Sequence, residues 1–249
     1  MLAQFTNCAN EQTQFSTVVV SMKIFLDVGS NRGQTVSVIR QPRYAFDLIY
    51  CFEPVPELQR VIAREYRDAR IVINEVGLWN QTCEKPIFST GSQSGSIFAD
   101  KVNVDPQHSV LCKFVRASDW FRDHLTETDE VYLKLNCEGC EVDIIEDLLD
   151  SNEYRKVTSL GVAFDVRKIP SQRGREKEIT RRLEESGVRN YVELRDGDDL
   201  KEKIHAWLSM AGAERQTLGI RIRQLVYDCQ TFAARVARYS RRRFTGRSF

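Results

Sequence analysis

Two glycines, four residues apart, follow a short apolar run and could bring the backbone close to a ligand. The pattern from Asp27 to Gly33 is Asp-x-Gly-x-x-x-Gly, with Gly29 first, and differs from the Gly-x-Gly-x-x-Gly of dinucleotide sites. Glycine permits a tight turn and close backbone approach, and N–H groups at a following helix start can bind a carboxylate. Asp27 suits an ammonium group. The loop therefore predicts a ligand with both groups, such as the amino-acid end of methionine.

A second carboxylate, Glu53, stands at the end of the next apolar run, 20 residues after Gly33. A carboxylate at such a strand end can accept hydrogen bonds from both hydroxyls of a ribose. Pro54 follows directly and ends the strand, because proline cannot continue a central strand. Each feature alone has a purely structural explanation, since the glycines can form an ordinary turn and Glu53 can be a solvated residue or a helix cap. In this order and spacing, the loop and Glu53 together predict a nucleoside-type cofactor.

A third strand end, Asn74 to Leu78, should lie near the adenine of such a cofactor. Asn74 or Glu75 could contact the adenine amino group. An apolar neighbour, Val76 or Leu78, could pack on the ring. An ordinary polar loop explains the same residues equally well.

A polar cluster closes the fourth predicted strand, from Lys134 to Glu141. Its lysine, amide and two carboxylates could orient an acceptor hydroxyl and take its proton. The alternative is an ordinary helix start, where carboxylates are favoured by the helix dipole. The cluster also contains a single Cys-x-x-Cys pair, and a structural zinc needs about four ligands. We therefore predict no metal site.

The elements that must position these residues alternate between strand and helix. Apolar runs rich in β-branched residues predict strands at 18–28, 48–52, 70–74, 130–135, 159–164 and 191–194. Helical spacing predicts helices at 35–39, 57–65, 140–149 and 176–185, and another helix that Ser118 would cap. Residues 80–115 should form a long loop with short strand pieces. This alternation predicts an α/β fold with a doubly wound, mostly parallel sheet and helices on both faces.

The chain suits one large domain with appendages. We expect a flexible lead-in at 1–17, the α/β domain at 18–212 and a basic helical extension at 213–249. The net charge of +1 gives no general attraction to nucleic acid. The nine arginines from residue 215 onward leave a peripheral membrane or protein contact open for the extension. A homodimer is a further expectation. The cysteines are odd in number and scattered, and no signal peptide or membrane span is evident, so we expect a soluble, cytoplasmic protein with reduced thiols.

Three sequence blocks resemble the FkbM-type methyltransferases. They are 27–34, Phe52-Glu53-Pro54, and Lys134-x-Asn136-Cys137-Glu138-Gly139-Cys140-Glu141, within a resemblance that covers roughly residues 22 to 200. The last block is the most specific. The resemblance implies a seven-stranded Rossmann-like sheet, S-adenosylmethionine as methyl donor, and O-methylation, commonly of a sugar or a polyketide-type product. It also implies cofactor contacts from Ser30, Asn31, Pro54 and Asn136.

One departure from that family affects the chemistry. The family usually has Asp where this chain has Asn136, and an amide cannot act as a base near neutral pH. Glu138 is then the first candidate for a base or acceptor anchor, with Glu141 and Asp165 as alternatives and Lys134 steadying the carboxylates. Two other functions stay open. One is an RNA methyltransferase guided by the arginine-rich end; the other is an inactive methyltransferase fold that serves as an interaction module.

Overall fold

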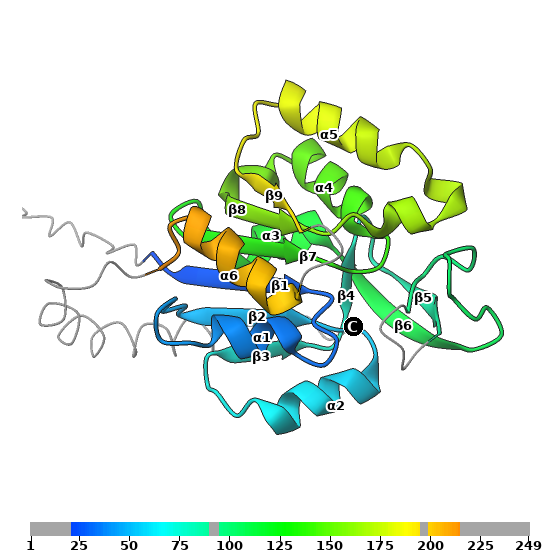
Figure 1. The fold of residues 1–249 in the computed structure, drawn as a ribbon, viewed down its shortest axis with the longest axis horizontal. Helices are drawn as coiled ribbons and strands as arrows, with labels where there is room; N and C mark the ends of the chain where they lie inside the picture. The colour runs from blue at the N-terminus through cyan, green and yellow to red at the C-terminus, as the bar shows by residue number, and fades with distance from the viewer. Residues whose placement is uncertain (1–20, 90–94, 195–198, 215–249) are drawn as a thin grey trace, which may run out of the picture.

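A six-stranded parallel sheet forms the centre of the computed structural model, which describes residues 21–89, 95–194 and 199–214 (Figure 1). The strand order is β3-β2-β1-β7-β8-β9, and every pairing in this sheet is parallel. The strands are β1 (Lys23–Val28), β2 (Leu48–Phe52), β3 (Ile71–Asn74), β7 (Glu130–Leu135), β8 (Val157–Val162) and β9 (Tyr191–Glu193). The predicted α/β fold with a parallel sheet is confirmed.

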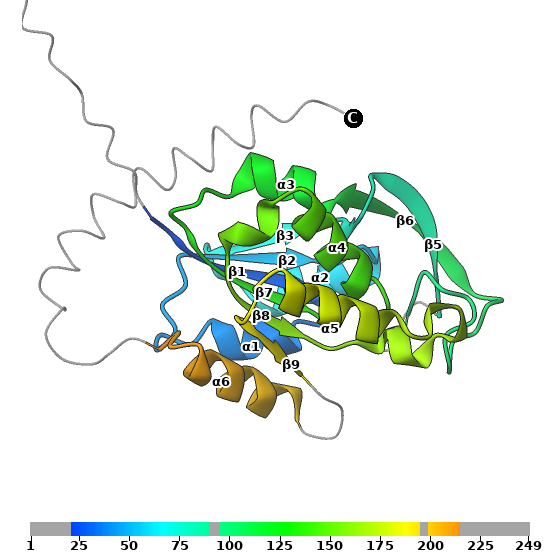
Figure 2. The same cartoon turned by 90° about the horizontal axis from the view of Figure 1, so that it is seen from above.

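Helices cover both faces of this sheet. They are α1 (Gln34–Ile39), α2 (Pro56–Glu65), α3 (Ala117–His124), α4 (Glu141–Asp150), α5 (Arg175–Glu185) and α6 (Leu200–Met210). Figure 2 shows α1 and α6 on one side of the sheet and α3 and α4 on the other. Short 3₁₀ turns lie between α4 and β8, at Glu153–Lys156, and between β8 and α5, at Asp165–Lys168 and Pro170–Gln172.

Alternation along the central strands supplies two hydrophobic cores, one on each face. In β1, Ile24 and Leu26 belong to one core and Phe25 to the other, as the two-residue period of a strand requires. Phe25 packs against Trp207 of α6, with ring centroids 5.8 Å apart. Because β1 and β7 are buried on both faces, the two loops that follow them start from fixed positions.

A small second sheet projects beside the carboxyl ends of these strands. It consists of β4 (Gly77–Trp79), β6 (Ser109–Arg116) and β5 (Cys83–Phe88), in the order β4-β6-β5. The β5–β6 pair is antiparallel, and the β4–β6 pair is parallel. We predicted a long loop with short strand pieces over 80–115, and the structure has strands there, because β5 and β6 pair with each other.

One predicted helix cap needs correction, and one helix was not predicted. The described residues contain six strands of the central sheet, so the expected seventh strand stays a prediction. Ser118 does not cap its helix: α3 begins at Ala117, and the backbone N–H of Ser118 donates to Asp147 Oδ2 at 2.8 Å. The helix α6 had not been predicted.

The predicted lead-in and nearly all of the basic C-terminal extension lie outside the described residues. Within 21–89, 95–194 and 199–214, no helix combines the length and apolar character that crossing a membrane requires.

Candidate functional site

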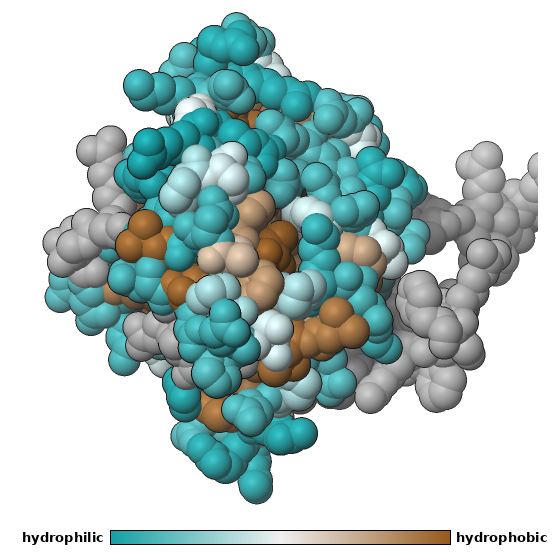
Figure 3. All heavy atoms as spheres, turned by 90° about the vertical axis from the view of Figure 1, so that its right-hand side faces the viewer, coloured by the Kyte–Doolittle hydropathy of each residue, from teal (hydrophilic) through white to brown (hydrophobic). Residues whose placement is uncertain are grey.

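A pocket with an empty volume of about 1050 Å³, its open mouth included, lies at the carboxyl ends of β1, β2 and β7. Ligands of open α/β sheets bind at this edge. These strand ends point to the right in Figure 1, and Figure 3 shows that face with hydrophobic side chains gathered near its middle. The predicted residues in the pocket lining are Gly29, Ser30, Asn31, Glu53, Pro54, Lys134, Asn136 and Glu138.

The glycine loop after β1 is in direct contact with the turn after β7. Gly29 has φ +77°, and a Cβ built there would lie 2.0 Å from the carbonyl oxygen of Asn136. Its N–H and that of Ser30 donate to the Phe52 carbonyl at 3.1 and 3.2 Å. Gly33 lies outside the pocket lining, at the start of α1, where a Cβ would meet the ring of Tyr66 at 2.4 Å. Close packing therefore explains both glycines.

Asp27 and Lys134 form a buried ion pair at the base of the pocket. They are register partners on neighbouring strands, and Lys134 Nζ lies 2.9 Å from Asp27 Oδ1, with both side chains at most 1% exposed. Lys134 Nζ also donates to the carbonyl of Gly29 at 2.8 Å. Asp27 is not part of the lining, so its predicted contact with a ligand's ammonium group stays a prediction.

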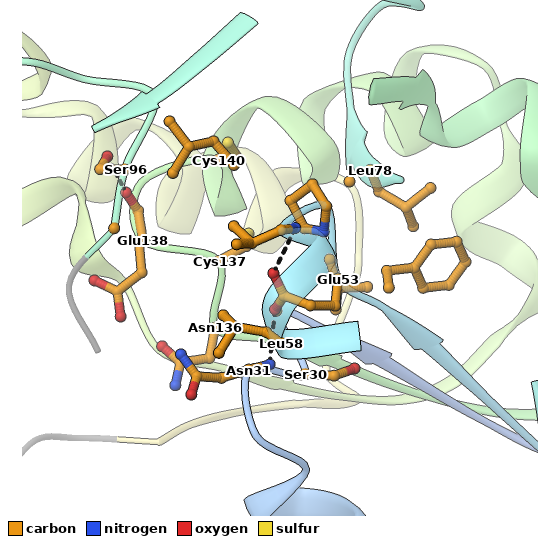
Figure 4. Close-up of a pocket in the computed structure, with 18 of the residues that line it drawn as sticks. Ser30, Asn31, Glu53, Leu58, Leu78, Ser96, Asn136, Cys137, Glu138 and Cys140 are labelled. Carbon is orange, nitrogen blue, oxygen red and sulfur yellow. Dashed lines mark hydrogen bonds between the residues drawn. The ribbon is translucent and has the colours of Figure 1, made fainter. Parts of the chain in front are cut away.

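Glu53 presents a buried carboxylate to the pocket from the end of β2. The backbone N–H of Asn31 donates to Oε2 at 2.8 Å, and that of Val55 donates to Oε1 at 3.0 Å (Figure 4). The side chain of Gln59 holds the Glu53 carbonyl at 2.8 Å. Burial raises the pKa of Glu53 to about 7, although the two N–H groups favour the ionised form.

The turn between β7 and α4 forms the opposite wall of the pocket. Asn136, Cys137, Glu138 and Cys140 line it, whereas Glu141 is fully buried behind it. Glu141 Oε1 accepts hydrogen bonds from the backbone N–H groups of Cys137, at 2.9 Å, and Gly139, at 3.1 Å. Burial, followed by the nearby charge of Asp165, raises the pKa of Glu141 to about 7. The carboxylate of Glu141 thus holds the turn in shape.

Glu138 points into the pocket from a strained position, with φ +61°. Its Oε2 contacts Lys101 Nζ, and its carbonyl accepts a hydrogen bond from Ser96 Oγ at 2.6 Å. Burial and the charge of Asp165 raise the pKa of Glu138, while Lys101 opposes this rise. Asp165 itself is buried outside the lining and pairs with Lys168 at 2.6 Å.

The third strand end reaches the pocket through the last residues of the predicted segment. Gly77 and Leu78 belong to the lining, and Leu78 was one of the two candidates for packing on an adenine ring. Val76 packs against the core, and Glu75 belongs to a separate shallow hollow beside α2. The sequence therefore located the segment without identifying which of its residues face the cavity.

Several residues at the site were not among the predicted ones, including four from three separate segments. Ser96 and Lys101 come from the segment before β6, Leu58 from α2, and Leu200 from the start of α6. Leu58 lies in the predicted helix 57–65, and the helical spacing of apolar residues there is the available signal for it. Lys101 lies in a stretch with no hydrophobic periodicity, so no sequence signal singles it out.

No group of three or more potential metal ligands occurs within the described ranges. Cys137 and Cys140 are both free thiols, and burial raises the pKa of Cys137 well above its usual value. The polar side chains of the lining include two carboxylates, amides, hydroxyls and a buried lysine.

Comparison with known proteins gives one structural similarity. No family model matches the sequence, and no curated protein matches it. The fold is similar to the crystal structure of the methyltransferase FkbM from Methylobacillus flagellatus, at 18% sequence identity and a TM-score of 0.38. The similarity covers 59% of this chain and 35% of that one, so the chain spans about a third of that protein's length. Such a distant likeness does not transfer a function.

Proposed function

We propose that this protein is an S-adenosylmethionine-dependent methyltransferase that methylates a hydroxyl oxygen of a sugar or another small metabolite. The observation that carries the proposal is the Glu53 carboxylate at the end of β2. It is 4% exposed, fixed by two backbone N–H groups and part of the pocket lining.

The Glu53 carboxylate is suited to a ribose diol. A carboxylate can accept about four hydrogen bonds, and Asn31 and Val55 supply one backbone donor to each of its oxygens. Each oxygen thus retains accepting capacity for a vicinal hydroxyl. A buried carboxylate with unused acceptor capacity is costly in an empty protein, and a bound diol would offset that cost.

The remaining lining fits the other parts of the cofactor. Leu58, Leu78 and Phe114 provide apolar surface for an adenine ring. The loop residues Gly29 and Asn31 belong to the lining, where their backbone could meet the amino-acid end.

The reaction itself would depend mainly on orientation and exclusion of water. S-Adenosylmethionine supplies an electrophilic methyl group when it is bound. We assign Glu138 to anchor the acceptor hydroxyl and accept its proton, because its carboxylate lies in the lining opposite Glu53 (Figure 4). Asn136 would orient the acceptor by hydrogen bonding, since its amide cannot take a proton near neutral pH. Lys134 neutralises Asp27 and holds the Gly29 carbonyl.

Calorimetric titration of S-adenosylmethionine into the wild type and Glu53→Ala tests the proposal. We expect the variant to lose about 2 kcal/mol or more of binding free energy, because it removes a charged acceptor of two hydrogen bonds. Glu57→Ala, which removes an exposed carboxylate from the first turn of α2, is the matched control and should bind normally. Unchanged affinity in Glu53→Ala would refute the ribose assignment. A wild type that binds no cofactor would instead favour an interaction module.

A further inference from the structure

Lys101 is a lysine buried beside the pocket, with 4% of its surface exposed. Lysine is almost never this buried unless its charge is paired. Here the ammonium group contacts Glu138 Oε2, whose side chain is 21% exposed. The pair therefore joins a group hidden in the protein to a group that faces the cavity.

The segment that carries Lys101 is attached to the β7–α4 turn at further points. Ser96 Oγ donates to the Glu138 carbonyl at 2.6 Å. The ring of Phe98 lies so close to Gly139 that a Cβ there would be 3.0 Å from it. Together with Lys101, these contacts fix both the backbone and the carboxylate of Glu138.

The far side of the same segment is anchored to the 3₁₀ turns after β8. The backbone N–H of Val102 donates to the Lys168 carbonyl at 2.8 Å. Asp100 Oδ2 accepts a hydrogen bond from the backbone N–H of Ser171 at 2.8 Å. The backbone of Lys101 is therefore held between two anchored neighbours, and its buried side chain reaches Glu138 from a fixed origin.

The charges around Glu138 oppose one another. Burial and Asp165 disfavour its anion, whereas Lys101 and Lys168 favour it. Asp165 is already paired with Lys168 at 2.6 Å. Lys101 is thus the cation that contacts Glu138 directly, and it engages Oε2.

We propose that Lys101 is a positioning residue that holds the Glu138 carboxylate as an anion, in one orientation, at the acceptor side of the pocket. The proposal rests on the proposed function, in which Glu138 receives the proton of the acceptor hydroxyl. With Oε2 bound by Lys101, Oε1 is the oxygen that meets the acceptor. Lys101 acts through Glu138 and touches neither the cofactor nor the acceptor.

The test is to titrate Glu138 in protein that contains ¹³C-carboxyl-labelled glutamate, by NMR. Glu138→Gln identifies the signal by its disappearance. In Lys101→Met, a variant of similar length and no charge, the proton affinity of Glu138 should rise at least about tenfold, because a contacting cation is lost. Lys101→Arg should restore most of the wild-type titration, which a merely space-filling role would not predict.

Lys156→Met is the matched control. Lys156 is also buried and paired, with Glu153 at 2.6 Å, and it holds the Phe121 carbonyl. Lys156→Met should leave the titration of Glu138 unchanged. If Lys101→Met does not fold, Lys101→Gln replaces it in the same experiment.

An unchanged Glu138 titration in a folded variant without the Lys101 charge would overturn the proposal. Failure of Lys101→Arg to restore the wild-type titration of Glu138 would also overturn it. Calorimetry with S-adenosylmethionine separates this failure from failure of the proposed function, because Lys101 is not part of the cofactor contacts. A wild type that binds no cofactor refutes the methyl transfer, whereas the titration alone decides whether Lys101 controls Glu138.

Discussion

The raised pKa of Glu53 makes cofactor binding depend on pH in a calculable way. Burial places this pKa at about 7 in the free protein, and only the ionised form can accept a ribose hydroxyl hydrogen bond on each oxygen in addition to the two backbone N–H groups. About ten elevenths of the carboxylate is ionised near pH 8 and about one eleventh near pH 6. Affinity should therefore fall about tenfold between these values, which corresponds to about 1.4 kcal/mol.

Calorimetric titration with S-adenosylhomocysteine at about pH 6, 7 and 8 measures this dependence. This ligand keeps the adenosine that Glu53 is proposed to bind and lacks the positive sulfonium. Binding selects the carboxylate form, so close to one proton should be released for each ligand bound near pH 6. Parallel titrations in two buffers of different ionisation enthalpy report that proton.

Glu53→Gln is the control, because it removes the titrating group and keeps the side-chain shape. Its weaker binding should vary little over the same pH range. Glu141 also has a pKa raised to about 7, but it lies outside the lining. A slope that persists in Glu53→Gln would assign the proton to Glu141 or another group. A wild type with constant affinity from about pH 6 to pH 8 would refute the ribose contact.

Two further predictions concern the glycine loop and the buried acids. Gly29→Ala should abolish cofactor binding, because its Cβ would lie 2.0 Å from Asn136 O. It should also lower the free energy of unfolding by more than the ~1–2 kcal/mol that a left-handed residue costs. Gly187→Ala, at φ +73° with open space around it, is the control, and equal losses of thermal stability in the two variants would contradict the prediction. In the folded protein the pKa values of Glu53 and Glu141 are about 7, above their usual value of 4.5. Protonation of these two groups therefore stabilises the fold fully below pH 4.5, and this stabilisation is lost as the pH rises through about 7. The melting temperature of the unliganded protein should fall over this window, less steeply in Glu53→Gln; an equal fall in both proteins would exclude Glu53 as a cause.

The central strands could be predicted because their local signal is strong. The apolar runs predicted at 48–52 and 130–135 are the observed β2 and β7. Both strands are buried on both faces, so their composition alone marks them. Strand β6 has only two buried residues, Cys112 and Phe114, among eight, and its apolar pattern is correspondingly weak. Its partner β5 is similar, which explains why a loop was expected there.

The helix α6 shows a different reason for failure. Its buried residues Ile204, Trp207 and Leu208 have the i, i+3, i+4 spacing of a helix face, and Asp199 caps its start. This signal is present in the sequence, between the predicted strand 191–194 and the basic extension. The helix matters for packing, because Trp207 fills the space that a side chain at Gly161 would occupy.

Residues at the site were predictable where the strand end alone determines their place. Glu53 and Asn136 directly follow β2 and β7, so both reach the pocket. The pairing of Asp27 with Lys134 depends on β1 lying next to β7, although 101 residues separate the two strands in the chain. Lys101 reaches Glu138 from a segment of irregular structure, and no local pattern encodes that contact.

The pocket is built by charged groups of two kinds. Lys134 bonds to the carbonyls of Val28 and Gly29, and Glu141 bonds to the N–H groups of Cys137 and Gly139, so each fixes one of the two loops. Both side chains are at most 1% exposed, and water competes little for these bonds.

Glu53 and Glu138 differ from this pair because both face the cavity and keep an oxygen available to a ligand (Figure 4). Burying an ion pair such as Asp27 and Lys134 is seldom a net gain in stability. The position of this ion pair under the glycine loop explains its presence instead, because Lys134 fixes the loop whose backbone holds Glu53. Loss of the Lys134 charge would leave Asp27 uncompensated and release that loop, so an effect on cofactor binding would arise without any contact between Lys134 and the acceptor.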